Sequence, residues 1–263
     1  MSTRPVALVT GASAGIGEAI ARRLAADGHD LVVVARSADR LAVLAKDLEA
    51  EHGGDVEVLV ADLTDGEQLA RVEARLGDPD RPIDLLVNNA GYGTVGTFVE
   101  MPADREENEI ALNVVALMRL THAALGPMKE RKRGAILNVS SLAGQQPTPG
   151  MATYGATKAF VTSFTMAVRE EVRGSGIRIT VLAPGFTNTE FQARAGVDEI
   201  GVPGILLQSP DEVAKAGLDA LTKDNAIVVS GWLNWAAATA TKVVPTSVVR
   251  RVTSLVMKRS KVT

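Results

Sequence analysis

The chain has 263 residues and a formal net charge of −3, from 28 lysine and arginine residues against 31 aspartate and glutamate residues. It contains no cysteine, which excludes disulfide bonds and thiolate metal sites. The three histidines, His29, His52 and His122, are scattered along the sequence, so we expect no metal centre of another kind.

Hydrophobic residues make up 46% of the sequence but aromatic residues only 3%. A chain rich in alanine, valine, leucine and isoleucine suits buried parallel strands covered by helices, and its length suits one α/β domain. The apolar run near the N-terminus is interrupted at once by Gly11. We therefore expect no signal peptide, no transmembrane segment and a cytoplasmic location.

Strand and helix patterns alternate from the first residues onward. An apolar run at 6–9 ends in a glycine turn, and a helical pattern follows at 16–26. After a second β-branched run at 31–34, Ser37 is placed to cap the next helix, which two glycines close. The unit strand, helix, strand, helix is therefore present at the start of the chain.

The same alternation continues along the rest of the sequence. Strict alternation predicts a parallel sheet with helices on both faces, that is, a Rossmann-type doubly wound α/β fold of about seven strands. We find no linker or repeat, so residues 1–263 are expected to form a single domain. The remaining predicted strands are 56–60, 83–87, 135–139, 177–182 and 227–229, and the remaining helices follow Thr64 or cover 110–128 and 156–172.

Three glycines separate the first predicted strand from the first helix in residues 10–17, Thr-Gly-Ala-Ser-Ala-Gly-Ile-Gly. Bare backbone can approach a pyrophosphate there, and the helix N-terminus supplies amide donors and a favourable dipole. The segment therefore predicts a dinucleotide cradle. The spacing Gly-x-x-x-Gly-x-Gly differs from the generic Gly-x-Gly-x-x-Gly, and a glycine turn without a ligand is the alternative.

With this loop and three further motifs, the sequence resembles the short-chain dehydrogenase/reductase family. Asn88-Asn89-Ala90-Gly91 matches the family's segment after the fourth strand, and Asp62 matches its adenine-contacting acid. Residues 184–189, Pro-Gly-Phe-Thr-Asn-Thr, match its Pro-Gly-x-x-x-Thr loop. The resemblance covers residues 5–230 and implies a nicotinamide cofactor at the carboxyl ends of the strands.

The end of the second strand indicates which cofactor is used. An acid there would bond a ribose 2′-hydroxyl and repel a 2′-phosphate, whereas a guanidinium attracts that phosphate. Ala35-Arg36-Ser37 offers a cation and no acid, so NADP(H) is favoured over NAD(H). Ala14 stands where many NADP-using relatives carry a second basic residue, and Arg36 as a solvated surface charge is the alternative.

Together, the motifs and the resemblance predict a set of cofactor contacts from every loop at this edge of the sheet. The expected cofactor-binding residues are Gly11, Ser13, Ala14, Gly15, Ile16, Gly17, Arg36, Ser37, Asp62, Leu63, Asn89, Ala90, Gly91, Tyr154, Lys158, Pro184, Gly185, Thr187 and Thr189.

Tyr154 and Lys158 are four residues apart in a predicted helix, so the phenol and the ammonium group lie on one face. A nearby ammonium stabilises phenolate and lowers the pKa of a phenol toward the working range. Tyr-x-x-x-Lys alone is a weak signal, and a core tyrosine with an exposed lysine is the alternative. The resemblance adds Ser141 and Asn113 and completes the family's catalytic Asn-Ser-Tyr-Lys tetrad.

The resemblance also implies a role for each of these residues. Tyr154 exchanges the proton with the substrate oxygen, Ser141 hydrogen-bonds that oxygen, and Lys158 holds the nicotinamide ribose. Asn113 supports a water that relays protons to the lysine, and Thr189 contacts the carboxamide.

Two C-terminal regions bear on the substrate. Residues 186–208, where the family usually has a substrate lid, are mostly apolar, which favours an apolar or amphipathic substrate such as a 3-oxoacyl or steroid-like ketone. Packing of this lid on its own domain is the alternative. Residues 235–263 contain no acid and predict a short basic amphipathic helix beyond Pro245. It could contact a subunit or cover the pocket, lie on a membrane surface, or recognise an acidic carrier.

The predicted function is an NADP(H)-dependent carbonyl reductase or alcohol dehydrogenase that moves a hydride between nicotinamide and a carbonyl or secondary alcohol. Its expected partner is a small molecule and not a nucleic acid, and the resemblance implies a homodimer or homotetramer. Two alternatives stay open. One is a nucleotide-binding sensor or scaffold without turnover, against which the complete set Ser141, Tyr154 and Lys158 argues; the other is a dehydratase or epimerase on the same fold.

Overall fold

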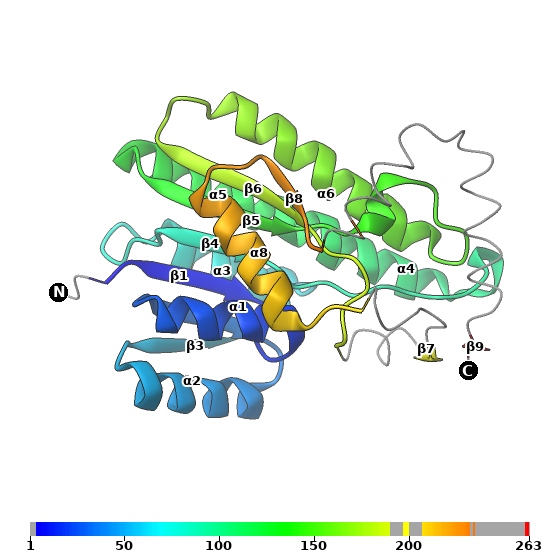
Figure 1. The fold of residues 1–263 in the computed structure, drawn as a ribbon, viewed down its shortest axis with the longest axis horizontal. Helices are drawn as coiled ribbons and strands as arrows, with labels where there is room; N and C mark the ends of the chain where they lie inside the picture. The colour runs from blue at the N-terminus through cyan, green and yellow to red at the C-terminus, as the bar shows by residue number, and fades with distance from the viewer. Residues whose placement is uncertain (1–3, 190–196, 200–206, 232–233, 235–260, 263) are drawn as a thin grey trace.

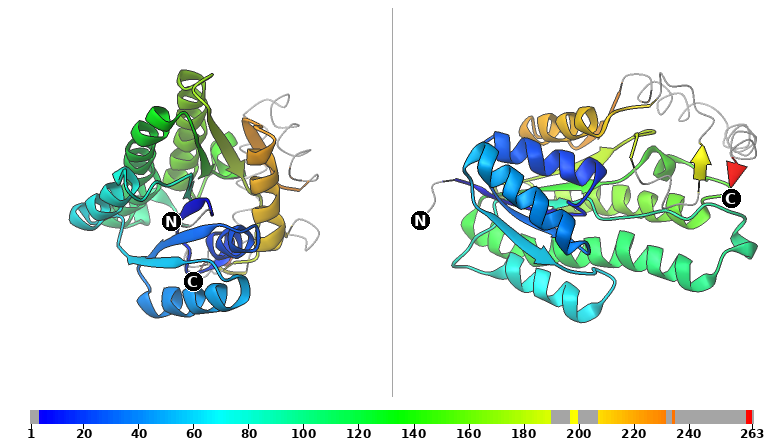
Figure 2. Two further views of the ribbon diagram at one scale, coloured as in Figure 1. Left: turned by 90° about the vertical axis from the view of Figure 1, so that its left-hand side faces the viewer. Right: turned by 90° about the horizontal axis from the view of Figure 1, so that it is seen from below.

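Parallel strands form a seven-stranded sheet with helices on both faces (Figures 1 and 2). The computed structural model describes residues 4–189, 197–199, 207–231, 234 and 261–262. The strands are β1 (Val6–Thr10), β2 (Asp30–Ala35), β3 (Val56–Val60), β4 (Leu85–Asn88), β5 (Gly134–Val139), β6 (Ile177–Ala183) and β8 (Ile227–Val229). Their order is β3-β2-β1-β4-β5-β6-β8. Successive strands are added on one side of β1 up to β3 and on its other side from β4 onward, so the strand order reverses between β1 and β4. This is the predicted Rossmann-type doubly wound fold, in which ligands bind where the order reverses.

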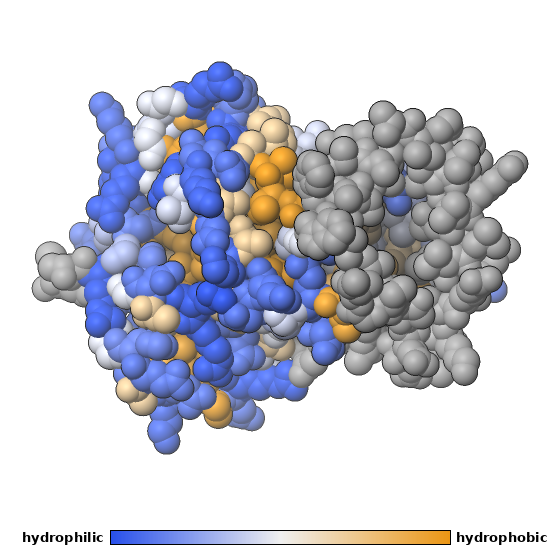
Figure 3. All heavy atoms as spheres, in the orientation of Figure 1, coloured by the Kyte–Doolittle hydropathy of each residue, from blue (hydrophilic) through white to orange (hydrophobic). Residues whose placement is uncertain are grey.

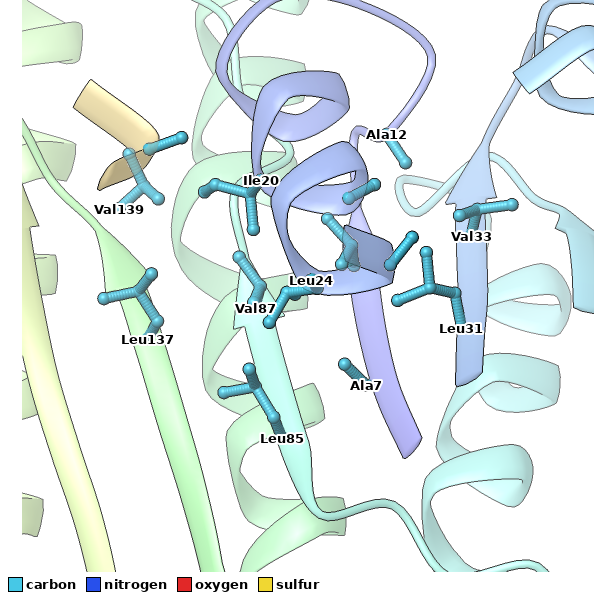
Figure 4. Close-up of a cluster of buried hydrophobic side chains, with 14 of the residues drawn as sticks. Ala7, Ala12, Ile20, Leu24, Leu31, Val33, Leu85, Val87, Leu137 and Val139 are labelled. Carbon is cyan, nitrogen blue, oxygen red and sulfur yellow. The ribbon is translucent and has the colours of Figure 1, made fainter. Parts of the chain in front are cut away.

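Helices cover both faces of this sheet. The described α-helices are α1 (Gly15–Ala26), α2 (Ala38–His52), α3 (Gly66–Gly77), α4 (Ala103–Ile110), α5 (Leu117–Arg131), α6 (Ala152–Glu171) and α8 (Pro210–Thr222). The first face carries α1, α2 and α8, and the second carries α3, α5 and α6. Figure 4 shows the first layer, where Ile20 and Leu24 of α1 lie over Val87 of β4. Hydrophilic side chains cover most of the outer surface around α2 and α8 (Figure 3).

Successive residues of the central strands point into opposite layers. In β1, Ala7 and Val9 lie in the core under α1, while Leu8 lies in the core under α3 and α5. All six residues of β5 are buried. Uninterrupted apolar runs are typical of parallel strands covered on both faces, which is why they could be recognised in the sequence.

The helix predicted at 110–128 is part of a longer helical stretch. It begins with α4 at Ala103, passes through a π-helical turn, η2 (Ala111–Ala116), and continues as α5. The residues of α4 are mostly polar, so apolar periodicity did not reveal this helix or the change of winding. π-Helical turns within α-helices are frequent at functional sites, and Asn113 lies in this one.

The stretch Ala103–Arg131 is also long and apolar enough to cross a membrane, judged by length and composition among the described residues. Core helices of a globular domain pass the same test. Here Leu120, Ala124 and Met128 are buried against the sheet, so core packing accounts for part of the apolar character of this helix.

The predicted lid begins and ends at neighbouring positions. The Asn188 amide donates to the Gln208 carbonyl at 2.9 Å, and the Gln208 amide donates to the Phe186 carbonyl at 2.9 Å. Between them, β7 (Val197–Glu199) pairs antiparallel with β9 (Lys261–Val262) from the end of the chain. Most of the apolar lid residues and the predicted basic helix within 235–263 lie outside the described residues.

A buried polar network joins the two central strands to the helices behind them. The Asn88 side-chain amide donates to Asn138 Oδ1 at 2.9 Å and to Thr121 Oγ1 of α5 at 3.0 Å. Asn138 Nδ2 donates to Thr165 Oγ1 of α6 at 2.9 Å. Both asparagines lie near the carboxyl ends of β4 and β5, so this network holds the strand ends in register with α5 and α6.

We expect Asn138→Ala to lower the free energy of unfolding by about 2–4 kcal/mol, because it removes a buried side chain and one hydrogen bond each from the Asn88 amide and the Thr165 hydroxyl. Urea denaturation measures the change. Asn108→Ala, at an exposed position of α4, is the matched control and should shift the unfolding free energy by less than about 0.5 kcal/mol. Equal stability of the two variants would contradict a structural role for the network.

Candidate active site

The glycine loop between β1 and α1 adopts a conformation that favours glycine. Gly11 and Gly15 have φ angles of +66° and +61°, in the left-handed region. A Cβ atom on Gly17 would lie 2.3 Å from the Gly11 carbonyl oxygen and 2.4 Å from Asn89 Nδ2. Ala14 occupies the N-cap of α1 and supplies no side-chain cap, so the amide end of the helix is open toward a ligand.

Thr10 links this loop to the Asn-Asn-Ala-Gly segment after β4. Its hydroxyl accepts hydrogen bonds from the amides of Asn89 and Ala90, both at 3.0 Å, and donates to the Val87 carbonyl at 3.2 Å. The Asn89 side chain donates in return to the carbonyls of Thr10 and Gly11. The predicted site did not include Thr10; its place at the end of a strand before the first glycine is the signal that could have identified it.

Arg36 lies at the end of β2 and is exposed over 73% of its side chain. Its Nη1 atom is 3.7 Å from Asp62 Oδ2, so the predicted phosphate-binding and adenine-contacting residues lie side by side. Burial alone would raise the pKa of Asp62, but hydrogen bonds from Thr64 and the charge of Arg36 outweigh it and lower that pKa. Asp62 is therefore a carboxylate that orients the guanidinium.

Ser37 and Leu63, which were also predicted to contact the cofactor, lie next to Arg36 and Asp62 at the same edge of the sheet. Ser37 is the N-cap residue of α2, as expected, but its side chain makes no capping hydrogen bond. The N-terminal end of α2 beside Arg36 therefore lacks a side-chain cap. Leu63 follows Asp62 and is buried in the core under α3.

Tyr154, Lys158 and Ser141 come together as predicted. The helix that carries the first two starts at Ala152, four residues earlier than the apolar pattern indicated, so Tyr154 lies in its first turn. The Lys158 Nζ atom is 5.7 Å from the centroid of the Tyr154 ring, and the Ser141 hydroxyl hydrogen-bonds to the phenol. Ser141 is held at the start of η3 (Leu142–Gln145), where its hydroxyl also accepts from the Ala143 amide at 3.1 Å.

Asn113 joins the group from the π-helical turn. Its amide nitrogen donates to the Tyr92 carbonyl at 2.8 Å and to Thr157 Oγ1 at 3.1 Å, and its oxygen accepts from the Tyr92 amide at 3.2 Å. A Cβ on Gly91 would lie 2.9 Å from Asn113 Oδ1 and 3.4 Å from Lys158 Nζ. The glycine therefore lets Asn113 and Lys158 approach the same stretch of backbone.

The two ionisable groups of the tetrad are both buried, and burial dominates their titration. It raises the pKa of Tyr154 to about 12, against a lowering effect of the Ser141 hydrogen bond. The expectation that this pKa is lowered toward the working range is therefore wrong, because burial of the phenol disfavours its charged form. It lowers the pKa of Lys158 to about 8, so the lysine titrates close to neutral pH. The Lys158 ammonium donates to the Val139 carbonyl at 3.0 Å, which fixes it at the end of β5.

The loop after β6 completes the cradle. Pro184 accepts from the Leu142 amide at 3.0 Å through its carbonyl, which ties the loop to η3. The buried Asn234 side chain packs on Gly185, and Thr187 Oγ1 donates to the Gly185 carbonyl at 3.2 Å. A Cβ on Gly15 would lie 3.2 Å from Thr189 Cγ2, so this loop faces the glycine loop across the site.

The residues present fit a dinucleotide. Glycines with left-handed backbone bring bare chain to the uncapped amide end of α1, which suits a pyrophosphate. Arg36 presents its guanidinium at the end of β2, where a ribose 2′-phosphate would be recognised. Ser13 lies in the glycine loop, Ile16 in the first turn of α1, and Ala90 in the linked segment after β4. The predicted cofactor site and the predicted catalytic site are thus one continuous region.

Comparisons with known proteins agree with this geometry. The family model described as short chain dehydrogenase matches residues 5–199. A serine 3-dehydrogenase from Rhizobium radiobacter is 34% identical over 88% of this chain and 87% of its own length.

Two solved structures are similar over nearly the whole chain. A short-chain dehydrogenase from Sphingobium yanoikuyae in complex with NADPH is 40% identical, with a TM-score of 0.83 over 90% of this chain and 93% of its own. The bulky-bulky ketone specific alcohol dehydrogenase from Comamonas testosteroni is 34% identical, with a TM-score of 0.79 over 92% and 93%. The cofactor named in the first is the one that Arg36 favours.

We expect Arg36→Ala to raise the dissociation constant of NADPH by about 10–100-fold and to leave that of NADH nearly unchanged, because only NADPH carries the phosphate that the guanidinium binds. Isothermal titration calorimetry measures both constants. Arg173→Ala removes an equally exposed arginine beyond the C-terminus of α6 and should alter neither. An equal loss of affinity for both nucleotides in Arg36→Ala would contradict this role.

Proposed function

The chain belongs to the short-chain dehydrogenase/reductase family of NADP(H)-dependent oxidoreductases, and we propose that it is a carbonyl reductase or alcohol dehydrogenase for a bulky apolar ketone or its secondary alcohol. The observation that carries the proposal is the contact of Ser141 with Tyr154 one helical turn from Lys158, beside the dinucleotide cradle. The complete tetrad argues against a sensor or scaffold without turnover.

The geometry assigns each side chain a step in carbonyl reduction. The bound nicotinamide supplies the hydride. Tyr154 is a protonated phenol at neutral pH, because burial raises its pKa, and it donates this proton to the substrate oxygen as negative charge develops there. Ser141 hydrogen-bonds the same oxygen and orients it toward the phenol. Lys158 lies beside the phenol, and its positive charge stabilises the phenolate that remains.

Substrate size is the finer part of the proposal. The apolar residues of 186–208 favour a large apolar group, and the similar alcohol dehydrogenase whose name specifies bulky ketones supports the same class. Within the proposed lid, β7 pairs with β9, so the end of the chain contacts the segment that we propose binds the substrate. The serine dehydrogenase relative indicates the competing class, a small polar alcohol.

We further propose that the protein is a cytoplasmic homo-oligomer. Large apolar side chains are exposed on the helices of the second face, as expected of a surface that another subunit covers. These are Ile110, Val115, Met118, Phe160 and Met166. Sedimentation of the purified protein with and without anionic vesicles separates assembly in solution from association with a membrane surface.

The substrate proposal is tested with NADPH and a panel of medium-chain ketones, steroid ketones, 3-oxoacyl thioesters and small polar aldehydes. We expect stoichiometric NADPH oxidation with a kcat/KM at least about 100-fold higher for bulky ketones than for small polar carbonyls, because the larger group buries more apolar surface. A preference for the small polar carbonyls would overturn the substrate class but not the reaction. Product formation without net NADPH oxidation would indicate a dehydratase or epimerase.

Tyr154→Phe should retain NADPH binding within about twofold and lower kcat by at least about 100-fold, because only the proton donor is removed from an otherwise intact site. Calorimetry measures the binding, and the rate of NADPH oxidation measures turnover. Tyr92→Phe is the matched control, since the other tyrosine of the chain bonds only the Arg105 carbonyl with its hydroxyl. Undiminished turnover of Tyr154→Phe would rule out this mechanism.

A further inference from the structure

A carboxyl group that the sequence motifs did not single out lies buried beside the tetrad. Glu109, near the end of α4, has no exposed surface, and it lies one helical turn before Asn113. Glutamate is almost never fully buried unless it is paired, because removing a carboxylate from water costs several kcal/mol. Its position inside the site therefore requires partners.

Thr94 supplies one side of this pairing. Its amide donates to Glu109 Oε2 at 2.8 Å, and its hydroxyl oxygen lies 2.8 Å from the same Oε2 and 2.6 Å from Glu106 Oε1. One hydroxyl has one hydrogen and can donate to only one carboxylate. The hydroxyl hydrogen therefore serves one of these two carboxyls at a time, whereas the Thr94 amide bonds Glu109 in either case.

The other oxygen of Glu109, Oε1, takes no part in the hydrogen bonds with Thr94. Oε1 is buried and has no hydrogen-bond partner among the described residues. The charge of Glu109 acts on Lys158 of α6, and that of Lys158 acts on Glu109. The ammonium group of Lys158 has three hydrogens, and the Val139 carbonyl accepts one of them. Because α4 packs against α6, a buried anion and a buried cation lie on neighbouring helices, with hydrogen-bonding capacity left on both.

We propose that Glu109 is a positioning residue of this site: its carboxylate is the buried counter-charge that keeps Lys158 in the ammonium form. The inference rests on the proposed function only in that Lys158 serves catalysis as an ammonium. The other ionisable groups that face Glu109 are Glu106 on its own helix, Tyr92 from the segment after β4, and Tyr154 of α6.

The direction of the effect follows from the burial of both groups. Burial lowers the pKa of Lys158 to about 8, and the negative charge of Glu109 opposes this change. Burial raises the pKa of Glu109 to about 7, so the carboxyl becomes an anion just before the lysine begins to lose its proton. Between these two values the anion keeps Lys158 charged. Without it, the pKa of Lys158 falls further, and a larger share of the lysine is uncharged at neutral pH.

The titration of Lys158 is measured by NMR on protein labelled with ¹³C at the lysine ε-carbons, with the Lys158 signal assigned through Lys158→Arg. In Glu109→Gln, which keeps the shape and the acceptor for Thr94, we expect the pKa of Lys158 to fall by roughly one unit. Glu107→Gln removes the same charge from an exposed position of the same helix and should leave this pKa unchanged. An unchanged titration in Glu109→Gln, with the fold intact by circular dichroism, would overturn the inference.

A second variant tests the inference even if the fold does not tolerate a substitution of Glu109. The Thr94 hydroxyl lowers the pKa of Glu109, so Thr94→Val should leave Glu109 less ionised and lower the pKa of Lys158 in the same direction. A role confined to holding the 92–95 segment would predict no shift in Glu109→Gln. Because the NMR titration needs no substrate, its failure leaves the reductase proposal standing. Conversely, if the protein reduces none of the ketones tested, the pairing of Glu109 with Lys158 can still be tested by this titration.

Discussion

The burial of a lysine ammonium at the carboxyl edge of the sheet is the constraint that organises this site. Lys158 is only 5% exposed, and a buried cation is stable only where neighbours supply acceptors and opposite charge. The Val139 carbonyl at the end of β5 supplies an acceptor, and Glu109 of α4 supplies the charge. Gly91 leaves room for the ammonium next to Asn113. The lysine thereby fixes how a strand end, two helices and a glycine segment meet.

The fold and most of the site could be predicted because their signals are local. Each buried parallel strand is a short apolar run, and each helix repeats its apolar residues at helical spacing, so the alternation alone predicts the doubly wound sheet. The glycines at 11, 15 and 17 and the pair Tyr154 and Lys158 are likewise separated by a few residues. Topology then brings these local motifs to one edge of the sheet, where the structure places them.

The features that could not be predicted from the sequence depend on contacts between distant segments. Thr10 matters because its hydroxyl reaches amides some eighty residues away, at Asn89 and Ala90. In the sequence, the turn that carries Asn113 is apolar like an ordinary helix and gives no sign of its π-helical winding, and the polar helix before it gave no periodic signal. Glu109 stands in a run of acidic residues that reads as a solvated helix face, and only tertiary packing separates it from the exposed Glu107.

The site divides into a part held by the strand ends, which carries the tetrad and the cradle, and a connected part, the proposed substrate lid. The tetrad and the cradle are held by strand ends, hydrogen bonds and close backbone contacts that leave little room for change. Among the residues that the structure describes, the segment 186–208 is anchored at its ends through Phe186, Asn188 and Gln208, and at β7 by the end of the chain. Loops anchored in this way tolerate substitution without disturbing the strands beneath them. The motifs that reveal the reaction therefore carry little information about the substrate, which must be read from the lid and the C-terminal extension.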